Sequence, residues 1–233
     1  MTTATQNTGR RSLPLTLPAL LGATTLPGRL YSELESAIIR GTLQPGERLH
    51  ADDLAKHFGV SRIPIREALS SLGQAGWVEI KPRHGVHVRE RTVVELNELF
   101  DFRADVEALV ARWAAERRTD SDLVNLKLAV ERTRDAGATV ADDDGNGFIG
   151  FREALRQAAH NSVLAATSAS LEKRARFYFS TVQDQLGSDW VQLEQQVLDY
   201  VVAGDGEKAA ALTGEHIRDT GVAVHQILFG NSV

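Results

Sequence analysis

Residues 51–72 contain two short helical patterns separated by a glycine-containing turn, and this order strongly constrains the fold. Gly59 lies at the end of the first pattern, where its freedom to adopt a positive φ allows a helix to stop abruptly. Ser61 can cap the start of the second pattern. Pro64 fits only in a first helical turn, where its missing N–H has no partner within the helix. The sequence therefore predicts a helix-turn-helix.

The second helix of this motif has one basic side and one apolar side. Arg62 and Arg66 are four residues apart and share one face. The apolar side comprises Ile65, Ala68, Leu69 and Leu72. A guanidinium can bind the O6 and N7 atoms of guanine together, so this basic face is suited to reading DNA. The alternative is that both arginines are ordinary solvated charges.

Two short alternating runs follow and predict a β-hairpin with a basic tip. The runs are residues 76–80 and 86–89, and the turn between them is rich in Gly, Pro and basic residues. A helix-turn-helix followed by such a hairpin is a winged helix-turn-helix, an α+β fold. An amphipathic pattern over residues 30–40 predicts one more helix before it.

The distribution of charge divides the chain into a tail and two domains. The net charge is −5 overall, but residues 27–91 carry ten Lys and Arg against eight Asp and Glu. Residues 92–233 carry fourteen against twenty-three. A basic surplus in the winged helix fits a DNA-binding domain joined to an acidic second domain. We expect residues 1–26 to be a flexible tail, since prolines interrupt an apolar run that could otherwise suggest a signal peptide.

Composition excludes or weakens several other classes of protein. The chain contains no cysteine, so it has neither disulfides nor thiolate metal ligands. It has no apolar run of about 18 residues that would span a membrane, and we expect a cytoplasmic protein without a membrane partner. It also has no Ser-centred nucleophile elbow and no phosphate-binding loop, so an enzyme is the weaker alternative.

From Thr92 onward the sequence predicts helices only. Thr92 and Glu95 form a capping box at the start of a long amphipathic pattern. No proline follows Pro82. We expect an all-α bundle of six helices. The expected ranges are 92–118, 120–136, 148–159, 161–186, 189–202 and 207–229.

The N-terminal part resembles the DNA-binding domain of GntR-family bacterial transcription regulators. The resemblance rests on Leu-Gln-Pro-Gly-Glu-Arg-Leu at 43–49, on Gly-Val-Ser-Arg-Ile-Pro-Ile-Arg-Glu-Ala-Leu at 59–69, and on Gly-Trp-Val at 76–78. By position, the resemblance implies five DNA-contacting residues in the helix and the wing. These are Ser61, Arg62, Arg66, His84 and Gly85.

The C-terminal part is similar to the FCD effector domain of the FadR-type subfamily. The matching stretches lie at 99–107, 151–161 and 204–217. The resemblance implies a homodimeric regulator, more in keeping with a repressor than an activator. It also implies that the protein binds double-stranded operator DNA and a small organic acid or acyl effector.

The family's effector domain often holds a metal ion through one aspartate and three histidines. Three of the four corresponding positions are Phe148, Arg152 and Glu194, and His216 is the only remaining candidate ligand. Arginine stays protonated and has no lone pair to donate, so we expect no metal cofactor. A displaced site using Asp144, Glu194 and His216 is the alternative, and it would make the protein a metal-responsive regulator.

The expected effector pocket is cationic rather than metallic. Its candidate residues are Arg103, Glu107, Arg152, Glu194 and His216. A fixed guanidinium binds a carboxylate through two parallel hydrogen bonds, so we expect a carboxylate effector. The alternative is that Arg152 is exposed and that Arg103 and Glu107 form a surface ion pair one helical turn apart.

Overall fold

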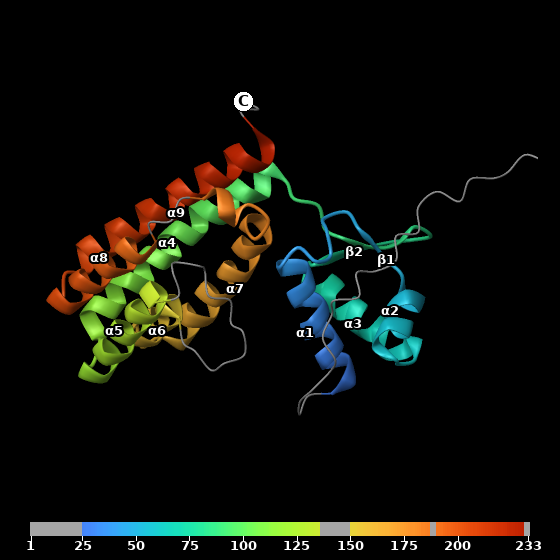
Figure 1. Ribbon diagram of the computed structural model, residues 1–233, viewed down its shortest axis with the longest axis horizontal. Coiled ribbons are helices and arrows are strands. Elements are labelled where there is room, and N and C mark those ends of the chain that lie inside the picture. Colours follow the sequence, from blue (N-terminus) through green and yellow to red (C-terminus); the bar gives the residue numbers. More distant parts are fainter. Residues whose placement is uncertain (1–24, 136–149, 187–189, 231–233) are drawn as a thin grey trace, which may run out of the picture. The chain divides into compact units, whose positions relative to one another are not determined.

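The computed structural model describes residues 25–135, 150–186 and 190–230 (Figure 1). They form two compact units divided between Glu90 and Arg91. Most of the expected tail, together with Asp144 and Phe148, lies outside the described residues. No described helix is long and apolar enough to cross a membrane.

The first unit is a winged helix-turn-helix, as predicted. Its antiparallel strands are ordered β1-β3-β2, and Val78 of β2 faces Val88 of β3. Helix α3 packs against α1 and α2. The elements are α1 Leu26–Ile39, β1 Arg48–Leu49, α2 Ala51–Phe58, α3 Arg62–Gln74, β2 Val78–Lys81 and β3 Gly85–Val88.

Local sequence signals determine the turn between α2 and α3. Gly59 ends α2 in the left-handed conformation, with φ 65° and ψ 32°. Pro64 lies in the first turn of α3, and Ser61 is its N-cap residue. The expectation that the Ser61 side chain caps the helix is wrong, because it makes no capping hydrogen bond. Its hydroxyl therefore stays available for another partner.

The apolar side of α3 forms the core of this unit together with α1. Ile65 and Leu72 are completely buried, and each such side chain contributes about 1.5–3 kcal/mol through its burial. The apolar positions expected in α1 are buried as well. They are Leu30, Leu34, Ala37 and Ile38.

The second unit is helical throughout its described residues, which confirms the predicted all-α bundle. Helices α4 and α9 are the longest and lie side by side (Figure 1). Gly221 permits this close approach, since a Cβ at this position would lie 2.7 Å from the Cβ of Phe100. The helices are α4 Val93–Arg117, α5 Asp120–Asp135, α6 Phe151–Ala158, α7 Ser162–Phe179, α8 Trp190–Ala203 and α9 Gly206–Phe229.

The helix expected over residues 161–186 is shorter than predicted. It begins as expected, with the Asn161 side chain accepting from Leu164 N–H at 2.8 Å. It ends at Phe179 and is followed by a short 3₁₀ segment, Gln183–Gln185. The residues at 180–182 are Ser-Thr-Val, which favour an α-helix less than straight-chain residues do. Periodicity alone does not detect this difference.

Candidate functional site

The basic side of α3 is exposed, and one of its arginines is held by a carboxylate from α2. Arg62 Nε lies 2.9 Å from Asp52 Oδ1, and the two side chains are 63% and 53% exposed. Arg66 and Ser61 are also exposed. The structure therefore places all three helix residues expected to contact DNA on the surface, around the start of α3.

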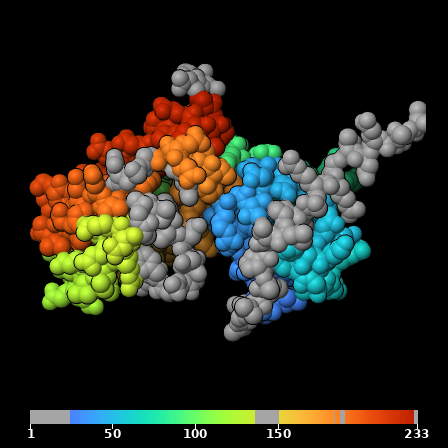
Figure 2. All heavy atoms as spheres, in the orientation of Figure 1, coloured from blue at the N-terminus to red at the C-terminus, as the bar shows by residue number. Residues whose placement is uncertain are grey.

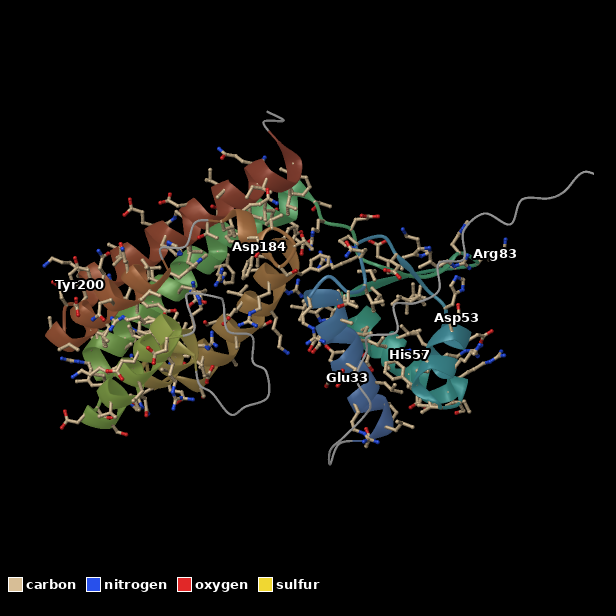
Figure 3. The ribbon with its side chains drawn as sticks, viewed as in Figure 1. Glu33, Asp53, His57, Arg83, Asp184 and Tyr200 are labelled. Atoms are coloured by element: carbon tan, nitrogen blue, oxygen red, sulfur yellow. The ribbon has the colours of Figure 1, made fainter. Side chains whose placement is uncertain are left out.

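The wing presents its own basic residues at the turn between β2 and β3. The His84 side chain is exposed, and the His84 backbone N–H donates to the Lys81 carbonyl at 3.0 Å. Arg83 adopts φ 65°, which is uncommon for a residue with a side chain. Figure 3 shows Arg83 at the tip of this hairpin. Arg83 was not among the residues expected to contact DNA.

Gly85 begins β3 and allows a second basic residue to pack beneath the wing. A Cβ at Gly85 would lie 3.0 Å from Arg48 Nε, and the φ of Gly85 is 98°. Burial, followed by the positive charges of Lys81 and Arg48, lowers the pKa of neighbouring His87. Arg48 and Lys81 therefore place positive charges beside His87 at the base of the wing. Arg48 was also missed by the sequence analysis, because a two-residue strand leaves no periodic signal.

A shallow groove of about 390 Å³ joins the helix and the wing. Arg66 and Gly85, both expected to contact DNA, line it. Asp52, the partner of Arg62, also lines the groove. Figure 2 shows α2, in cyan, on the visible surface of this unit. The groove thus brings residues from α2, α3 and the wing to one basic surface.

The interior of the helical unit contains a hydrogen-bonded network of charged side chains. Arg103 and Glu107 are each only 2% exposed, and Arg103 Nε lies 3.8 Å from Glu107 Oε1. The Ser168 hydroxyl donates to Glu107 Oε1 at 2.8 Å. Arg156 Nη1 donates to Glu172 Oε2 at 2.6 Å. The alternative of a surface pair is wrong for Arg103 and Glu107, because both are buried.

Glu172 is the central carboxylate of this network. Burial alone would raise its pKa, but the charges of Arg152, Arg156 and Arg176 outweigh burial and lower the pKa to about 2. Arg176 Nη2 lies 2.9 Å from the second Glu172 oxygen. Arg156 is also held by Glu153 at 2.9 Å. Both Arg156 and Arg176 are therefore paired within the protein.

Arg152 projects from α6 among groups that belong to four other helices. Its charge acts on Arg103 of α4, Glu172 of α7, Glu194 of α8 and His216 of α9. Burial, and then the like charge of Arg152, lowers the pKa of Arg103 to about 10. Between described residues, no hydrogen bond or ion pair holds the Arg152 guanidinium. Of the expected effector residues, Arg103, Glu194 and His216 thus lie near one half-buried cation.

Glu194 and His216 lie near this cation, and the Glu194 carboxylate is poorly satisfied. Burial raises the pKa of Glu194, and its Oε2 has no hydrogen-bond partner among the described residues. Burial, followed by the charges of Arg152 and Arg103, lowers the pKa of His216 to about 4. His216 is therefore neutral at pH 7. Its ring packs edge-on against Trp190, with ring centroids 4.9 Å apart.

These side chains do not fit the metal site that the effector domain often holds in this family. The described residues contain no group of three or more His, Asp or Glu side chains that could hold a metal ion. Arg152 places a positive charge where a ligand would be needed, and this charge opposes a cation. The displaced site that includes Asp144 lies partly outside the described residues.

Arg156, Ser168 and Glu172 were not among the expected effector residues. A signal for two of them was present, because Ser168 and Glu172 fall in step with Leu164 and Ala175, on the buried side of α7. A polar residue within an apolar stripe indicates a buried partner. Arg156 gave no comparable signal.

A second cluster fastens the start of the helical unit to the end of α7. Arg91 Nη1 donates to Thr181 Oγ1 at 2.8 Å, and Nη2 donates to the Phe177 carbonyl. The guanidinium carbon lies 5.0 Å from the centroid of the Phe177 ring. The Tyr178 hydroxyl donates to Glu95 Oε2 at 2.8 Å. We call this cluster the Arg91 anchor.

A helix-turn-helix with a basic wing, followed by a helical bundle, defines a DNA-binding transcription regulator. Comparison with protein families gives the same result in finer detail. The model of the gntR family of bacterial regulatory proteins matches residues 26–88, and that of the FCD domain matches residues 98–219. The chain belongs to the GntR family and to its FCD-containing branch.

Relatives and solved structures agree with this assignment. The chain is 33% identical over 108 residues to the HTH-type regulator YdhC of Bacillus subtilis, which covers 46% of this chain and 48% of that protein. It is 29% identical to the galactonate operon transcriptional repressor of Escherichia coli, over 79% of this chain and 91% of that protein. A GntR regulator from Rhodococcus sp. RHA1 has a TM-score of 0.67 and 27% identity, covering 86% of this chain and 98% of that one.

Proposed function

We propose that this protein is a repressor that binds its operator as a homodimer and is released by a small carboxylate. Arg152 carries the proposal about the effector. It is a half-buried guanidinium without a described partner, and it lies close enough to Arg103 and His216 to lower their pKa values. A carboxylate would neutralise Arg152 and accept two parallel hydrogen bonds from it.

On the DNA side, we assign base reading to α3 and backbone contacts to its start and to the wing. Arg62 and Arg66 are the base-reading candidates, because arginine pairs with guanine in the major groove. The free Ser61 hydroxyl suits a phosphate at the helix start. His84 and Gly85 would contact the backbone from the wing, where glycine permits a close approach.

Two copies of the chain are needed for this mode of binding. Helix-turn-helix regulators bind two half-sites about one helical turn apart, so a two-fold operator calls for a two-fold protein. We expect sedimentation equilibrium of the full chain to give twice the 25.4 kDa chain mass at micromolar concentration. A species of the single-chain mass under these conditions would contradict the homodimer.

One relative supports a repressor that an effector displaces from its operator. The galactonate operon repressor of E. coli is named for a hydroxy acid, and a hydroxy acid offers the carboxylate that Arg152 would bind. An effector that binds the free protein better than the DNA-bound form shifts the population away from the operator. The ratio of the effector's affinities for the two forms then determines how much protein leaves the operator.

The effector proposal is tested with purified protein and a panel of small carboxylates, beginning with galactonate. We expect at least one acid to raise the Tm of the wild type, since a ligand at a hundred times its Kd stabilises by about 2.7 kcal/mol. The same acid should fail to stabilise Arg152→Ala, while Lys127→Ala, which removes an exposed charge from α5, should respond normally.

A chelator provides the control for metal. The shift in Tm should persist in EDTA, because a guanidinium does not depend on metal ligands. Loss of the shift in EDTA, or an equal shift in Arg152→Ala, would contradict the proposed role of Arg152. Basal operator binding should be retained in Arg152→Ala, because the substitution leaves the DNA-binding unit unchanged.

A further inference from the structure

The Ile63 side chain is exposed and does not contribute to the core of the DNA-binding unit. It lies in the first turn of α3 and is 69% exposed, whereas Ile65 two residues later is completely buried. Burying a large apolar side chain is favourable, and the described residues supply no cover for Ile63. A surface isoleucine alone needs no explanation, but its location on this helix does.

Ile63 shares a face of α3 with residues that are proposed to enter the major groove. Positions three, four and seven residues apart lie on one side of a helix. The corresponding residues here are Arg66, Glu67 and Ser70, and all are exposed. A helix that inserts this face into DNA therefore inserts Ile63 with it, close to the N-terminal end that contacts bases in helix-turn-helix proteins.

The ion pair between Arg62 and Asp52 restricts the orientation of the Arg62 guanidinium. The ion pair is made through Nε, which lies 2.9 Å from Asp52 Oδ1, and this leaves the two Nη groups to donate elsewhere. Guanine offers two acceptors, O6 and N7, on its major-groove edge. A guanidinium held from behind by a carboxylate loses less conformational freedom when it binds such a pair of acceptors.

We propose that Ile63 contacts the 5-methyl group of a thymine and that Asp52 positions Arg62 for a guanine in the same half-site. This proposal rests on the proposed use of α3 as the recognition helix. The thymine methyl is the apolar group of the major groove. Ile63 would gain burial against it, whereas other base edges would lose hydrogen bonds to water without replacement.

Ile63 is tested with the full chain and duplexes selected from a random-sequence library. Each thymine of the selected half-site is replaced in turn by uracil, which lacks only the methyl group. At one position we expect uracil to weaken wild-type binding about fourfold, the effect of losing one buried methyl group. Ile63→Ala should bind the thymine and uracil duplexes equally, while Val124→Ala, an exposed site on α5, should behave as wild type.

Asp52 is tested by Asp52→Asn on the same duplexes. Preference for guanine over adenine at one position should fall about tenfold, in the range expected for a bidentate contact. Affinity for random-sequence duplex should rise, because a negative charge near the phosphates is removed. A merely structural role for Asp52 would lower both quantities.

The outcomes separate this inference from the function on which it rests. If no thymine is sensitive to uracil, or if Ile63→Ala keeps the sensitivity, the assignment to Ile63 is overturned. An unchanged guanine preference in Asp52→Asn overturns the role of Asp52. Failure of the proposed recognition helix is recognised separately, because Arg62→Ala and Arg66→Ala would then leave operator affinity unchanged.

Discussion

Replacing Glu172 by alanine should lower the free energy of unfolding by about 3–5 kcal/mol, the usual effect of leaving buried charges unpaired. The substitution removes the carboxylate that pairs with Arg156 at 2.6 Å and with Arg176 at 2.9 Å. The guanidinium groups of Arg152, Arg156 and Arg176 would then repel one another without the Glu172 carboxylate that now offsets their charge. Urea unfolding followed by circular dichroism measures the change.

An exposed ion pair provides the matched control. Glu207 pairs with Arg112 at 2.6 Å, but its side chain is 79% exposed. Glu207→Ala should change the unfolding free energy by no more than about 1 kcal/mol, because water screens exposed pairs. Equal losses in the two variants would show that burial does not determine the contribution of Glu172.

The same network should make the protein sensitive to acid. The pKa of Glu172 is about 2 in the folded protein, against an ordinary value of 4.5. Its contribution is therefore present above pH 4.5 and is lost as the pH falls toward 2, by roughly 3 kcal/mol. His216 acts in the same direction between pH 6.5 and about 4, since it stays neutral when folded. In Glu172→Ala the loss of stability below pH 4.5 should be smaller than in the wild type by the share that Glu172 contributes.

Arg62→Ala and Arg66→Ala should each weaken specific operator binding by about 1–3 kcal/mol, which is roughly five- to 150-fold. Both arginines are exposed, so the substitutions should leave the Tm almost unchanged. Fluorescence anisotropy with a selected operator duplex, at one fixed salt concentration, gives the affinities.

Random-sequence duplex separates base reading from general attraction to DNA. Loss of a base contact should reduce specific binding much more than nonspecific binding, whereas loss of a phosphate contact reduces both. Lys127→Ala supplies a charge-matched control in the other unit. Wild-type affinity in both arginine variants would refute the assignment of α3 as the recognition helix.

The elements of the DNA-binding unit could be predicted because their signals are local. Gly59 and Pro64 act within a turn of their own position, and the apolar face of α3 repeats at helical spacing. The ion pair of Arg62 with Asp52 could not be predicted, because it depends on how α2 and α3 cross. For the same reason, the place of Arg48 beneath Gly85 emerged only from the strand pairing.

The candidate effector site shows the same limit more clearly. Arg103 and Glu107 are one helical turn apart, so their pairing could be predicted from sequence, but their burial could not. Glu172 lies on α7 and meets Arg156 from α6, a partner that no local pattern indicates. Charged residues usually remain in water, so a sequence does not reveal the few that three folded helices bring together.

Through the Arg91 anchor, α7 links two parts of the helical unit. Glu172 meets the buried cations, and Phe177, five residues and roughly 8 Å further along the same helix, holds Arg91. Arg91 is the residue at which the chain leaves the helical unit for the DNA-binding unit. Helix α7 therefore contacts both the charged interior and the residue at which the chain leaves the helical unit. An anion bound at Arg152, as proposed, would compete for positive charge with a carboxylate on this same helix.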